Sequence, residues 1–443
     1  MDRRLYPVEF TVGGQVRPYS PQFQTEEQYA EAWKRVLLLS HGKAEVRCLC
    51  PGVGDKRLSI HSRSRSDRFH LARFPETGAE HSEDCVYYGV DAAMSGLGSY
   101  RRGVVQELDD GATKIKLKVG LQQRAATAPE APDTTLPSNA KSPASRSRSS
   151  QASMSLKGLL HFLWTQAGLN AWSPGMEGKR NMGVVHHHVM RVAMTTYAGR
   201  VRLAQNLIAA TPTSSGQQAS YNRAKSLDAV SHRRRLVVIA PLAQHQEGME
   251  GASTVPISGF HGIPYLALEE GIWHALERSF SRELDAWRAG NPVVAIAQTD
   301  PPRSSGGTVR AQVVDAALMH VTREWIPVDS GYEALIADQL VASKRRFEKP
   351  LRFDSGEDAT FPDFWLKDME SPVPLEVWGM ATAEYQARKA EKAAYYDNTY
   401  GNEGWWSWNA AIGDPVPEFP SRPSSRPLVL PGKASHQSEG GQQ

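Results

Sequence analysis

The chain alternates between stretches in which apolar residues recur at helical spacing and short, continuous apolar runs. Helical spacing predicts helices over residues 25–40, 156–172 and 271–287. Continuous apolar runs predict buried strands over residues 234–243 and 291–300, on either side of the third helix. Helices and strands that follow one another in this way indicate a mixed α/β domain.

Stretches that are poor in large apolar residues divide the chain. Residues 122–154 are mostly Ala, Pro, Ser and Thr, which bury too little surface to offset the entropy of ordering, so we expect a disordered linker there. From residue 414 the chain is rich in Pro, Ser and Gly, and we expect a disordered tail. The predicted organisation is an N-terminal α+β module over 1–121, the linker over 122–154, a middle α/β domain over 155–328, a C-terminal domain over 329–413 and the tail over 414–443.

The C-terminal domain has its own pattern of apolar positions. Helical spacing over 330–347 is followed by three short strand-like runs, over 349–354, 360–368 and 373–379. A strong helical pattern then covers 381–398. The expected order of elements is therefore helix, strand, strand, strand, helix.

Length and composition exclude several classes of protein. A chain of 443 residues is long enough for two or three domains, and 40% hydrophobic residues suffice for ordinary cores. No run of roughly 18 apolar residues is present, and the start of the chain lacks the apolar stretch of a signal peptide. Three cysteines do not make a secreted disulfide scaffold. We therefore expect a cytoplasmic protein without a membrane span.

The net charge of +3 does not by itself indicate a nucleic-acid partner. The basic residues are clustered, however, and such clusters can contact phosphate groups, although each is also compatible with ordinary surface charge. The clusters lie at residues 62–68, 101–102, 114–118, 233–235 and 344–346.

The three cysteines lie close together in the sequence. Cys48 and Cys50 form one pair, and His81 and Cys85 form a second pair after a gap of thirty residues. Four soft ligands in two close pairs suit a tetrahedral zinc site, and in a reducing compartment paired cysteines favour metal over disulfides. Because four protein ligands leave no open position, the sequence predicts a structural zinc ion.

Other histidines are weaker candidates. His61 and His70 lie in the β-hairpin predicted between the two pairs and are alternative ligands, but His81 is preferred because it lies one turn from the third cysteine. Three adjacent histidines at 186–188 rarely chelate one ion, because adjacent side chains point in different directions.

Acidic residues of the C-terminal domain occupy positions suited to a second metal. Asp363 lies in the second predicted strand, Glu376 between two apolar residues of the third, and Glu333 in the first turn of the helix. Carboxylates on neighbouring strands can converge on one magnesium ion, which prefers oxygen ligands and can polarise a phosphodiester and ionise a water. The alternative is a hairpin whose acids face solvent.

The stretches "PDF" and "EVWG" that contain two of these acids resemble the PD-(D/E)XK nuclease superfamily. The resemblance covers residues 329–410 and implies a restriction-endonuclease-like αβββαβ domain that uses magnesium. It also implies that Asp363 and Glu376 are the two acids of the motif and that Glu333 is the glutamate of the first helix.

The sequence departs from the superfamily motif at one position. Trp378 stands where the motif has its lysine, two residues after the second acid. Some members supply this lysine from the following helix, and the resemblance then implies Lys392 for this role, with Lys389 as the second choice. Both lysines share one face of the predicted helix with Tyr385, Arg388 and Tyr396.

The whole chain also resembles an uncharacterised bacterial family carried by integrative and conjugative elements, which implies a mobile-element setting and partner proteins from that element. Together these patterns predict a magnesium-dependent DNA nuclease whose zinc module holds nucleic acid or a partner protein. The alternative is a non-catalytic DNA- or protein-binding factor with a nuclease-derived fold.

Overall fold

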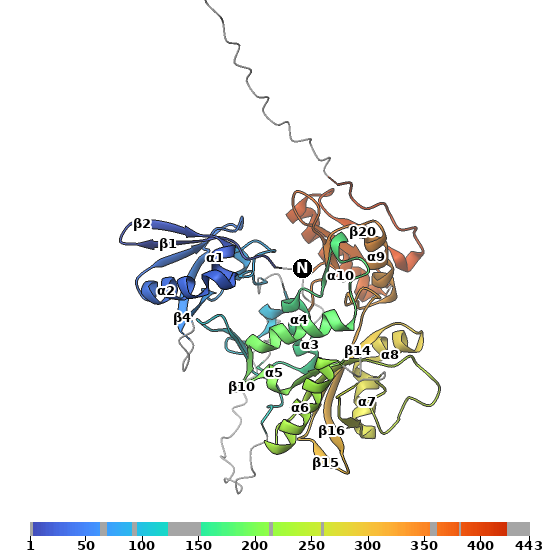
Figure 1. Ribbon diagram of the computed structural model, residues 1–443. Helices are drawn as coiled ribbons and strands as arrows, with labels where there is room; N and C mark the ends of the chain where they lie inside the picture. The colour runs from blue at the N-terminus through green and yellow to red at the C-terminus, as the bar shows by residue number, and fades with distance from the viewer. Residues whose placement is uncertain are drawn as a thin grey trace, which may run out of the picture.

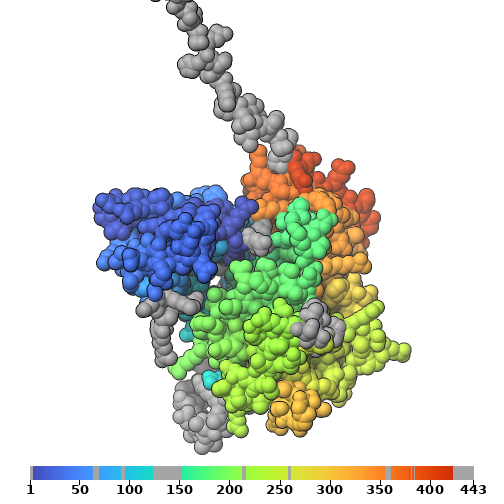
Figure 2. Space-filling model, in the orientation of Figure 1, coloured from blue at the N-terminus to red at the C-terminus, as the bar shows by residue number. Residues whose placement is uncertain are grey.

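The computed structural model describes residues 3–62, 69–90, 95–122, 152–211, 216–257, 261–354, 361–380 and 382–422. Figures 1 and 2 show three lobes that follow the order of the chain: an N-terminal lobe in blue, a middle lobe from green through yellow to light orange, and a C-terminal lobe in orange and red. Most of the predicted linker, and the predicted tail beyond residue 422, lie outside the described residues.

The N-terminal lobe is a five-stranded sheet in the order β2-β1-β3-β4-β5, in which all neighbours are antiparallel. The predicted helix over 25–40 is interrupted at Glu26, whose backbone is extended, so the long helix of this lobe begins at Ala30. Its Leu37 is buried with Val8 and Phe10 of the sheet. The elements are β1 (Val8–Val12), β2 (Gln15–Tyr19), α1 (Pro21–Thr25), α2 (Ala30–Ser40), β3 (Glu45–Cys48), β4 (Arg57–Ser62) and β5 (Phe69–Arg73).

The middle lobe is built on a six-stranded sheet with the path β11-β12-β14-β16-β13, to which β15 is added beside β16. All seven residues of β14 are buried, so both faces of the sheet are covered here. The strands are β11 (Leu207–Ala209), β12 (Val237–Pro241), β13 (Tyr265–Ala267), β14 (Val293–Thr299), β15 (Arg303–Ser305) and β16 (Thr308–His320).

Helices of the middle lobe fall in the stretches with helical spacing. The helix predicted over 156–172 ends at Ala167 because Gly168 adopts a left-handed conformation with φ of 67°. The helix predicted over 271–287 is broken at Phe280, whose backbone leaves the helical region. The helices are α3 (Leu156–Ala167), α4 (Met182–Thr195), α5 (Leu203–Asn206), α6 (Gln217–Ser231), α7 (Glu270–Ser279) and α8 (Ser281–Arg288).

Strands from both sides of the predicted domain boundaries pair with each other. A four-stranded sheet in the order β10-β9-β7-β6 joins β6 (Val105–Glu107) and β7 (Thr113–Ile115) to β9 (Thr196–Ala198) and β10 (Val201–Arg202). Ile115 and Leu121 belong to the same core as the middle lobe. The segment over 104–121, which carries β6 and β7, therefore forms part of the middle lobe, because its apolar side chains are buried there.

The C-terminal lobe follows the order helix, three strands, helix, strand. Its sheet has the order β20-β19-β18-β17-β8, with β19 parallel to β20 and an outer strand, β8 (Ala171–Trp172), from the middle of the chain. The first of the three strands, β17, ends at Glu348, whereas the sequence predicted a strand over 349–354. Pro350 lacks the backbone N–H that a further hydrogen bond between strands would need. The elements are α9 (Gly331–Ala342), β17 (Phe347–Glu348), β18 (Phe364–Leu366), β19 (Val373–Val377), α10 (Ala383–Tyr400) and β20 (Trp406–Trp408).

The core of this lobe includes the start of the predicted tail. Apolar residues of α9 pack with Phe347, Phe364 and Leu375 of the sheet. The ring of Trp406 lies against that of Phe419 in a tilted arrangement, with ring centroids 5.2 Å apart, and its indole nitrogen donates a hydrogen bond to the backbone carbonyl of residue 418. Val416 and Phe419 thus pack against the core of this lobe, and residues 414 and 418 accept hydrogen bonds from the two tryptophans of β20. In the described parts of the chain, every helix is too short or too polar to cross a membrane.

Candidate metal centre and candidate active site

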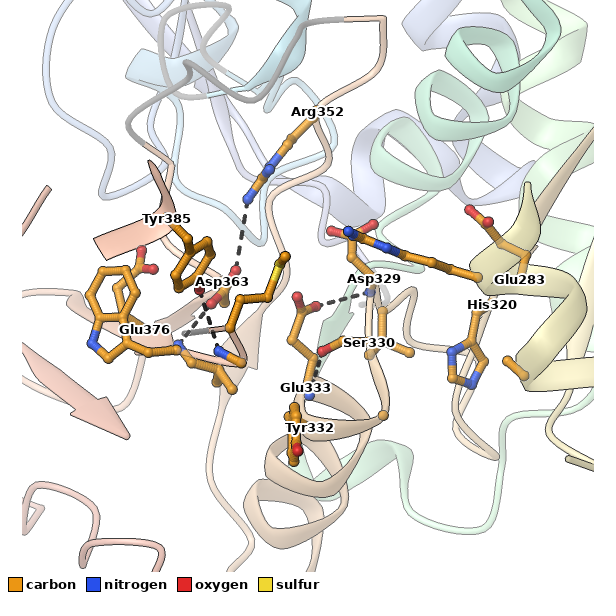
Figure 3. A pocket seen from close by; sticks show the side chains of 18 of the residues that line it. Glu283, His320, Asp329, Ser330, Tyr332, Glu333, Arg352, Asp363, Glu376 and Tyr385 are labelled. Carbon is orange, nitrogen blue, oxygen red and sulfur yellow. Dashed lines mark hydrogen bonds and ion pairs between the residues drawn. The ribbon is translucent and has the colours of Figure 1, made fainter. Parts of the chain in front are cut away.

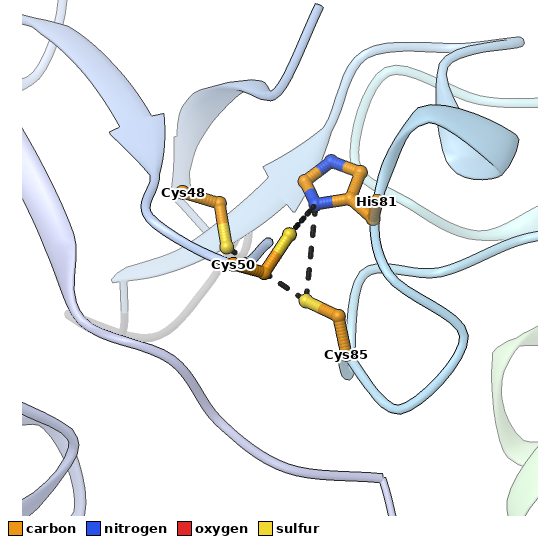
Figure 4. Close-up of side chains that lie close together, drawn as sticks. All are labelled: Cys48, Cys50, His81 and Cys85. Carbon is orange, nitrogen blue, oxygen red and sulfur yellow. Dashed lines mark hydrogen bonds between the residues drawn. The ribbon is translucent and has the colours of Figure 1, made fainter. Parts of the chain in front are cut away.

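The four predicted zinc ligands lie together in the N-terminal lobe (Figure 4). The strand β3 ends at Cys48, Cys50 follows in the next turn, and His81 and Cys85 lie on a loop that returns to the same place. All four side chains are buried, and their ligand atoms lie within 4.8 Å of one another.

The distances between the ligand atoms fit a tetrahedral zinc ion. Cys48 Sγ lies 3.7 Å from Cys85 Sγ, and His81 Nδ1 lies 3.6 Å from Cys50 Sγ and 3.8 Å from Cys85 Sγ. Bond lengths of about 2.3 Å for Zn–S and about 2.0–2.1 Å for Zn–N place the corners of a tetrahedron about 3.6–3.8 Å apart. This buried group could therefore bind zinc.

Backbone N–H groups also donate hydrogen bonds to two of the cysteine sulfur atoms. The N–H of Ser82 donates to Cys50 Sγ, and that of Tyr87 donates to Cys85 Sγ, each at 3.4 Å. Such donors stabilise thiolates, the form of cysteine that binds metal. The alternative ligands His61 and His70 face each other across β4 and β5 instead, with ring centroids 5.9 Å apart, and take no part in the group.

A cavity of about 780 Å³ lies between the C-terminal lobe and α8 of the middle lobe. All five residues predicted for the active site line it. Figure 3 shows Asp363, Glu376 and Tyr385 on one side and Asp329 and Glu333 opposite them. The predicted site residues in the lining are Glu333, Asp363, Glu376, Lys389 and Lys392.

The strands β18 and β19 hold two acids of this cavity next to each other. Asp363 precedes β18, and its Oδ2 accepts a hydrogen bond of 2.8 Å from the N–H of Val377 at the end of β19. Glu376 lies on β19 beside it, and its side chain is 2% exposed. The pairing of β18 with β19 therefore fixes the backbone positions of both carboxylates.

The face of α10 that carries the predicted lysines lies over Glu376. Lys392 Nζ lies 2.6 Å from Glu376 Oε1 and donates a hydrogen bond of 2.7 Å to the carbonyl of Phe361. Tyr396 donates from its hydroxyl to the same Glu376 oxygen at 2.7 Å. Lys389 Nζ instead lies 5.3 Å from the centre of the Trp378 ring. The structure thus brings Lys392 to the acid and Lys389 to the tryptophan.

A buried lysine that the sequence analysis missed organises the other acids. Lys349, which is 2% exposed, follows β17 directly, and its Nζ lies 2.6 Å from Glu333 Oε2, 3.1 Å from Asp329 Oδ2 and 3.9 Å from Asp363 Oδ1. Arg352 approaches the same Asp363 oxygen at 3.8 Å. The available signal in the sequence was a lysine at the start of the strand-like stretch over 349–354.

Glu333 has a second, structural role at the start of α9. Ser330 caps the helix by accepting a hydrogen bond of 3.1 Å from the N–H of Glu333. The carboxylate of Glu333 in turn accepts from the N–H of Asp329 at 3.0 Å. This arrangement is close to a capping box and fixes the glutamate at the edge of the cavity.

Burial raises the pKa of two carboxyl groups in this cavity. Burial raises the pKa of Glu376 to about 8, and the charge of Asp363 adds to the effect while Lys392 opposes it. Burial likewise raises the pKa of Glu333 to about 7 against the opposing charge of Lys349. Both groups can therefore take up a proton near neutral pH, and an added cation would favour their ionised forms.

Several of the predicted basic clusters are engaged within the protein. Arg345 is buried and forms two hydrogen bonds of 2.8 Å with Asp368, and Arg346 lies 2.6 Å from Glu83. Lys344 pairs with Glu177. In the cluster at 233–235, Arg234 and Arg235 pair with Asp228 and Asp300. The cluster at 62–68 lies almost wholly outside the described residues.

The carboxylates of the cavity are more dispersed than the cysteine–histidine group. Among the described residues, that group alone brings together three or more His, Cys, Asp or Glu side chains that could hold a metal ion. The adjacent histidines at 186–188 do not form such a group: His186 is buried with its Nδ1 3.3 Å from the carbonyl of Ala210, while the rings of His187 and His188 contact each other.

The fold and these two sites define a mixed α/β protein with a buried Cys₃His group and a separate acidic cavity. The chain belongs to the family described as a protein of unknown function, DUF1173, whose model matches residues 23–411. No curated protein and no solved structure matches the chain.

Proposed function

We propose that this protein is a metal-dependent DNA nuclease whose active site is the acidic cavity. The observation that carries the proposal is the convergence of Glu333, Asp363, Glu376 and Lys392 on one cavity. The elements that carry these residues follow the order helix, three strands, helix, strand, which supports a restriction-endonuclease-like domain. The setting would be that of an integrative and conjugative element, with DNA and proteins of that element as partners.

The donor chemistry of the cavity fits a magnesium ion. Asp363, just before β18, and Glu376, on β19, would hold it, because carboxylate oxygens are ligands that magnesium prefers. When bound, the ion would polarise the phosphodiester and favour ionisation of a water. The raised pKa of Glu376 also favours a cation at this place, because a positive charge compensates the cost of ionising a buried carboxyl.

Basic side chains of the protein would stabilise the negative charge of the substrate. Lys392, next to Glu376, would stabilise the negative charge that develops as water attacks phosphorus and the P–O bond breaks. Arg388 and Lys389 line the same cavity and would hold the flanking phosphates. Lys349 would keep Glu333 in place at the edge of the cavity.

The cysteine–histidine group would hold a structural zinc ion in this proposal. All four ligands come from the protein, which leaves no position for a substrate. The loop that carries His81 and Cys85 also contacts the C-terminal lobe through Glu83, which pairs with Lys367 and Arg346. The zinc would thus help to join the N-terminal lobe to the proposed nuclease domain.

A second candidate function is a DNA- or protein-binding factor with a nuclease-derived fold and no activity. Trp378 favours it, because this side chain is 4% exposed and occupies the position of the usual lysine. The ion pairs of Glu333 with Lys349 and of Glu376 with Lys392 favour it as well, since the negative charge of both carboxylates is already compensated by a lysine of the protein.

The test compares cleavage of plasmid and single-stranded DNA by the full-length protein with magnesium. Asp363→Ala is expected to lower the rate at least about 100-fold, because it removes one of the two proposed metal ligands. Glu370→Ala is the matched control, since Glu370 is an exposed acid in the turn between β18 and β19. Equal cleavage by the wild type and Asp363→Ala would exclude this active site. Binding of DNA without cleavage by the wild type would favour the second candidate.

A further inference from the structure

A second cavity, of about 400 Å³, lies between the N-terminal lobe and the helices α3 and α4. Three arginines contribute to its lining: Arg3 from the start of the chain, Arg73 from the end of β5 and Arg191 from α4. His188, one turn before Arg191 on α4, lines it too. Among the described residues that line this cavity, none is acidic. It shares no residue with the acidic cavity.

The protein compensates only part of this positive charge. Arg73 lies 2.5 Å from Glu107, which is outside the lining of the cavity. Arg3 donates a hydrogen bond of 2.9 Å to the carbonyl of Tyr88 and lies over the ring of that residue. Within the described residues, neither Arg3 nor Arg191 has a carboxylate at ion-pair distance.

The arginines also act on each other. Burial lowers the pKa of Arg3, and the positive charges of Arg73 and Arg191 lower it further. Like charges that share a partly desolvated cavity repel one another, so a bound anion would stabilise the arrangement. The lining also contains four neutral polar side chains, those of Thr113, Gln166, Thr195 and Thr196.

We propose that this cavity binds a phosphate group. Guanidinium groups present several N–H donors in a plane, which matches the tetrahedral oxygens of phosphate better than a single ammonium group does. Three of them from three separate elements can contact one phosphate from different sides. The group can belong to a small phosphate compound or to a nucleic-acid backbone, since both present the same oxygens.

The site goes beyond the proposed nuclease function because it does not require the acidic cavity. It lies beside the cysteine–histidine group, since Val86 lines the cavity and directly follows Cys85. The backbone N–H of Val86 also donates to the carbonyl of Arg4 at 2.9 Å, which holds the start of the chain, and with it Arg3, at the cavity.

Titration calorimetry of the full-length protein with inorganic phosphate tests the proposal. Arg191→Ala is the main variant, because Arg191 is exposed on α4 and its removal leaves no cavity in the core. Loss of one charge-assisted contact is expected to weaken binding about tenfold. Arg200→Ala is the matched control, since Arg200 is exposed in the turn between β9 and β10 and does not line the cavity. Arg3→Ala is a second variant and is expected to weaken binding to a similar extent.

The outcomes separate this site from the acidic cavity and identify the source of the phosphate. Phosphate binding that persists in Asp363→Ala but weakens in Arg191→Ala supports the proposal even if no nuclease activity is found. Competition by a single-stranded oligonucleotide would identify a backbone phosphate, and its failure to compete would identify a small phosphate compound. Absence of phosphate binding in the wild type, or equal binding by the wild type and both arginine variants, would overturn the proposal.

Discussion

Lys349 and Glu333 form a buried ion pair, with Nζ and Oε2 2.6 Å apart and side chains 2% and 8% exposed. The lysine follows β17 and the glutamate lies in the first turn of α9, so the pair joins the helix to the sheet at the edge of the acidic cavity. This contact places a buried cation next to three of the acids that line the cavity, Asp329, Glu333 and Asp363.

Replacing Lys349 by methionine is expected to lower the free energy of unfolding by about 3–5 kcal/mol, because Glu333 would be left buried without its partner. Urea denaturation at pH 8 measures the change. The loss should be smaller at pH 6, where protonation of Glu333 removes the uncompensated charge. Lys344→Met is the control and should cost at most about 1 kcal/mol, since the pair of Lys344 with Glu177 is exposed. Equal losses in the two variants would contradict the structural role of Lys349.

The stability of the protein is expected to fall as pH rises, through the ionisation of Glu376. Its pKa is raised by burial from its ordinary value of 4.5 to about 8 in the folded protein. The unfolded state therefore releases its proton first, and the stabilising contribution of the protonated form, complete below pH 4.5, is lost between pH 4.5 and 8.

The variant Glu376→Gln tests this contribution because its amide cannot ionise. Denaturation midpoints measured between pH 5 and 8 should depend less on pH in this variant than in the wild type. Glu370→Gln, which changes an exposed acid, should keep the slope of the wild type. Parallel pH profiles for the wild type and Glu376→Gln would show that Glu376 ionises normally.

Lys392 is expected to matter more than Lys389 for DNA cleavage, if the proposed function holds. Lys392 contacts Glu376 at 2.6 Å, whereas Lys389 lies over the Trp378 ring. Removing a group that stabilises the transition state costs about 100–1000-fold in rate. Lys392→Ala should show a loss of this size, and Lys389→Ala a smaller one that appears mainly as weaker DNA binding. The reverse order would assign the catalytic charge to Lys389.

Cys48→Ser is expected to lose the metal and to destabilise the N-terminal lobe. Metal analysis of the purified protein should find about one zinc ion per chain in the wild type and little in the variant. His61→Ala is the control and should retain the metal, because His61 lies on β4 outside the ligand group. Loss of zinc in both variants, or absence of zinc from the wild type, would contradict the assignment of the four ligands.

Much of the C-terminal lobe could be predicted because its signals are local. Apolar spacing identified α9, β18, β19 and α10, and Asp363 and Glu376 were expected to lie side by side because the two runs that carry them follow one another in the sequence. The cysteine–histidine group was also predictable, since Cys48 and Cys50 and then His81 and Cys85 are close in sequence. Each of these predictions needed only a few neighbouring residues.

What escaped prediction depends on contacts between distant segments. The role of Lys349 becomes visible only when β17 is placed beside the start of α9. Strand β8 has two residues, and only its pairing with β17 makes it part of the C-terminal sheet. The break at Phe280 left the spacing of apolar residues almost unchanged, so the pattern predicted one continuous helix.

Glu83, between His81 and Cys85, connects the two sites. Its two carboxylate oxygens pair with Lys367 at the end of β18 and Arg346 just before β17, at 2.7 and 2.6 Å. The loop that carries Glu83 is thus held both at the candidate metal centre and at the sheet next to Asp363. If metal occupancy shifts that sheet, the coupling is reciprocal: a ligand in the acidic cavity changes the affinity for zinc by the same factor as zinc changes the affinity for that ligand.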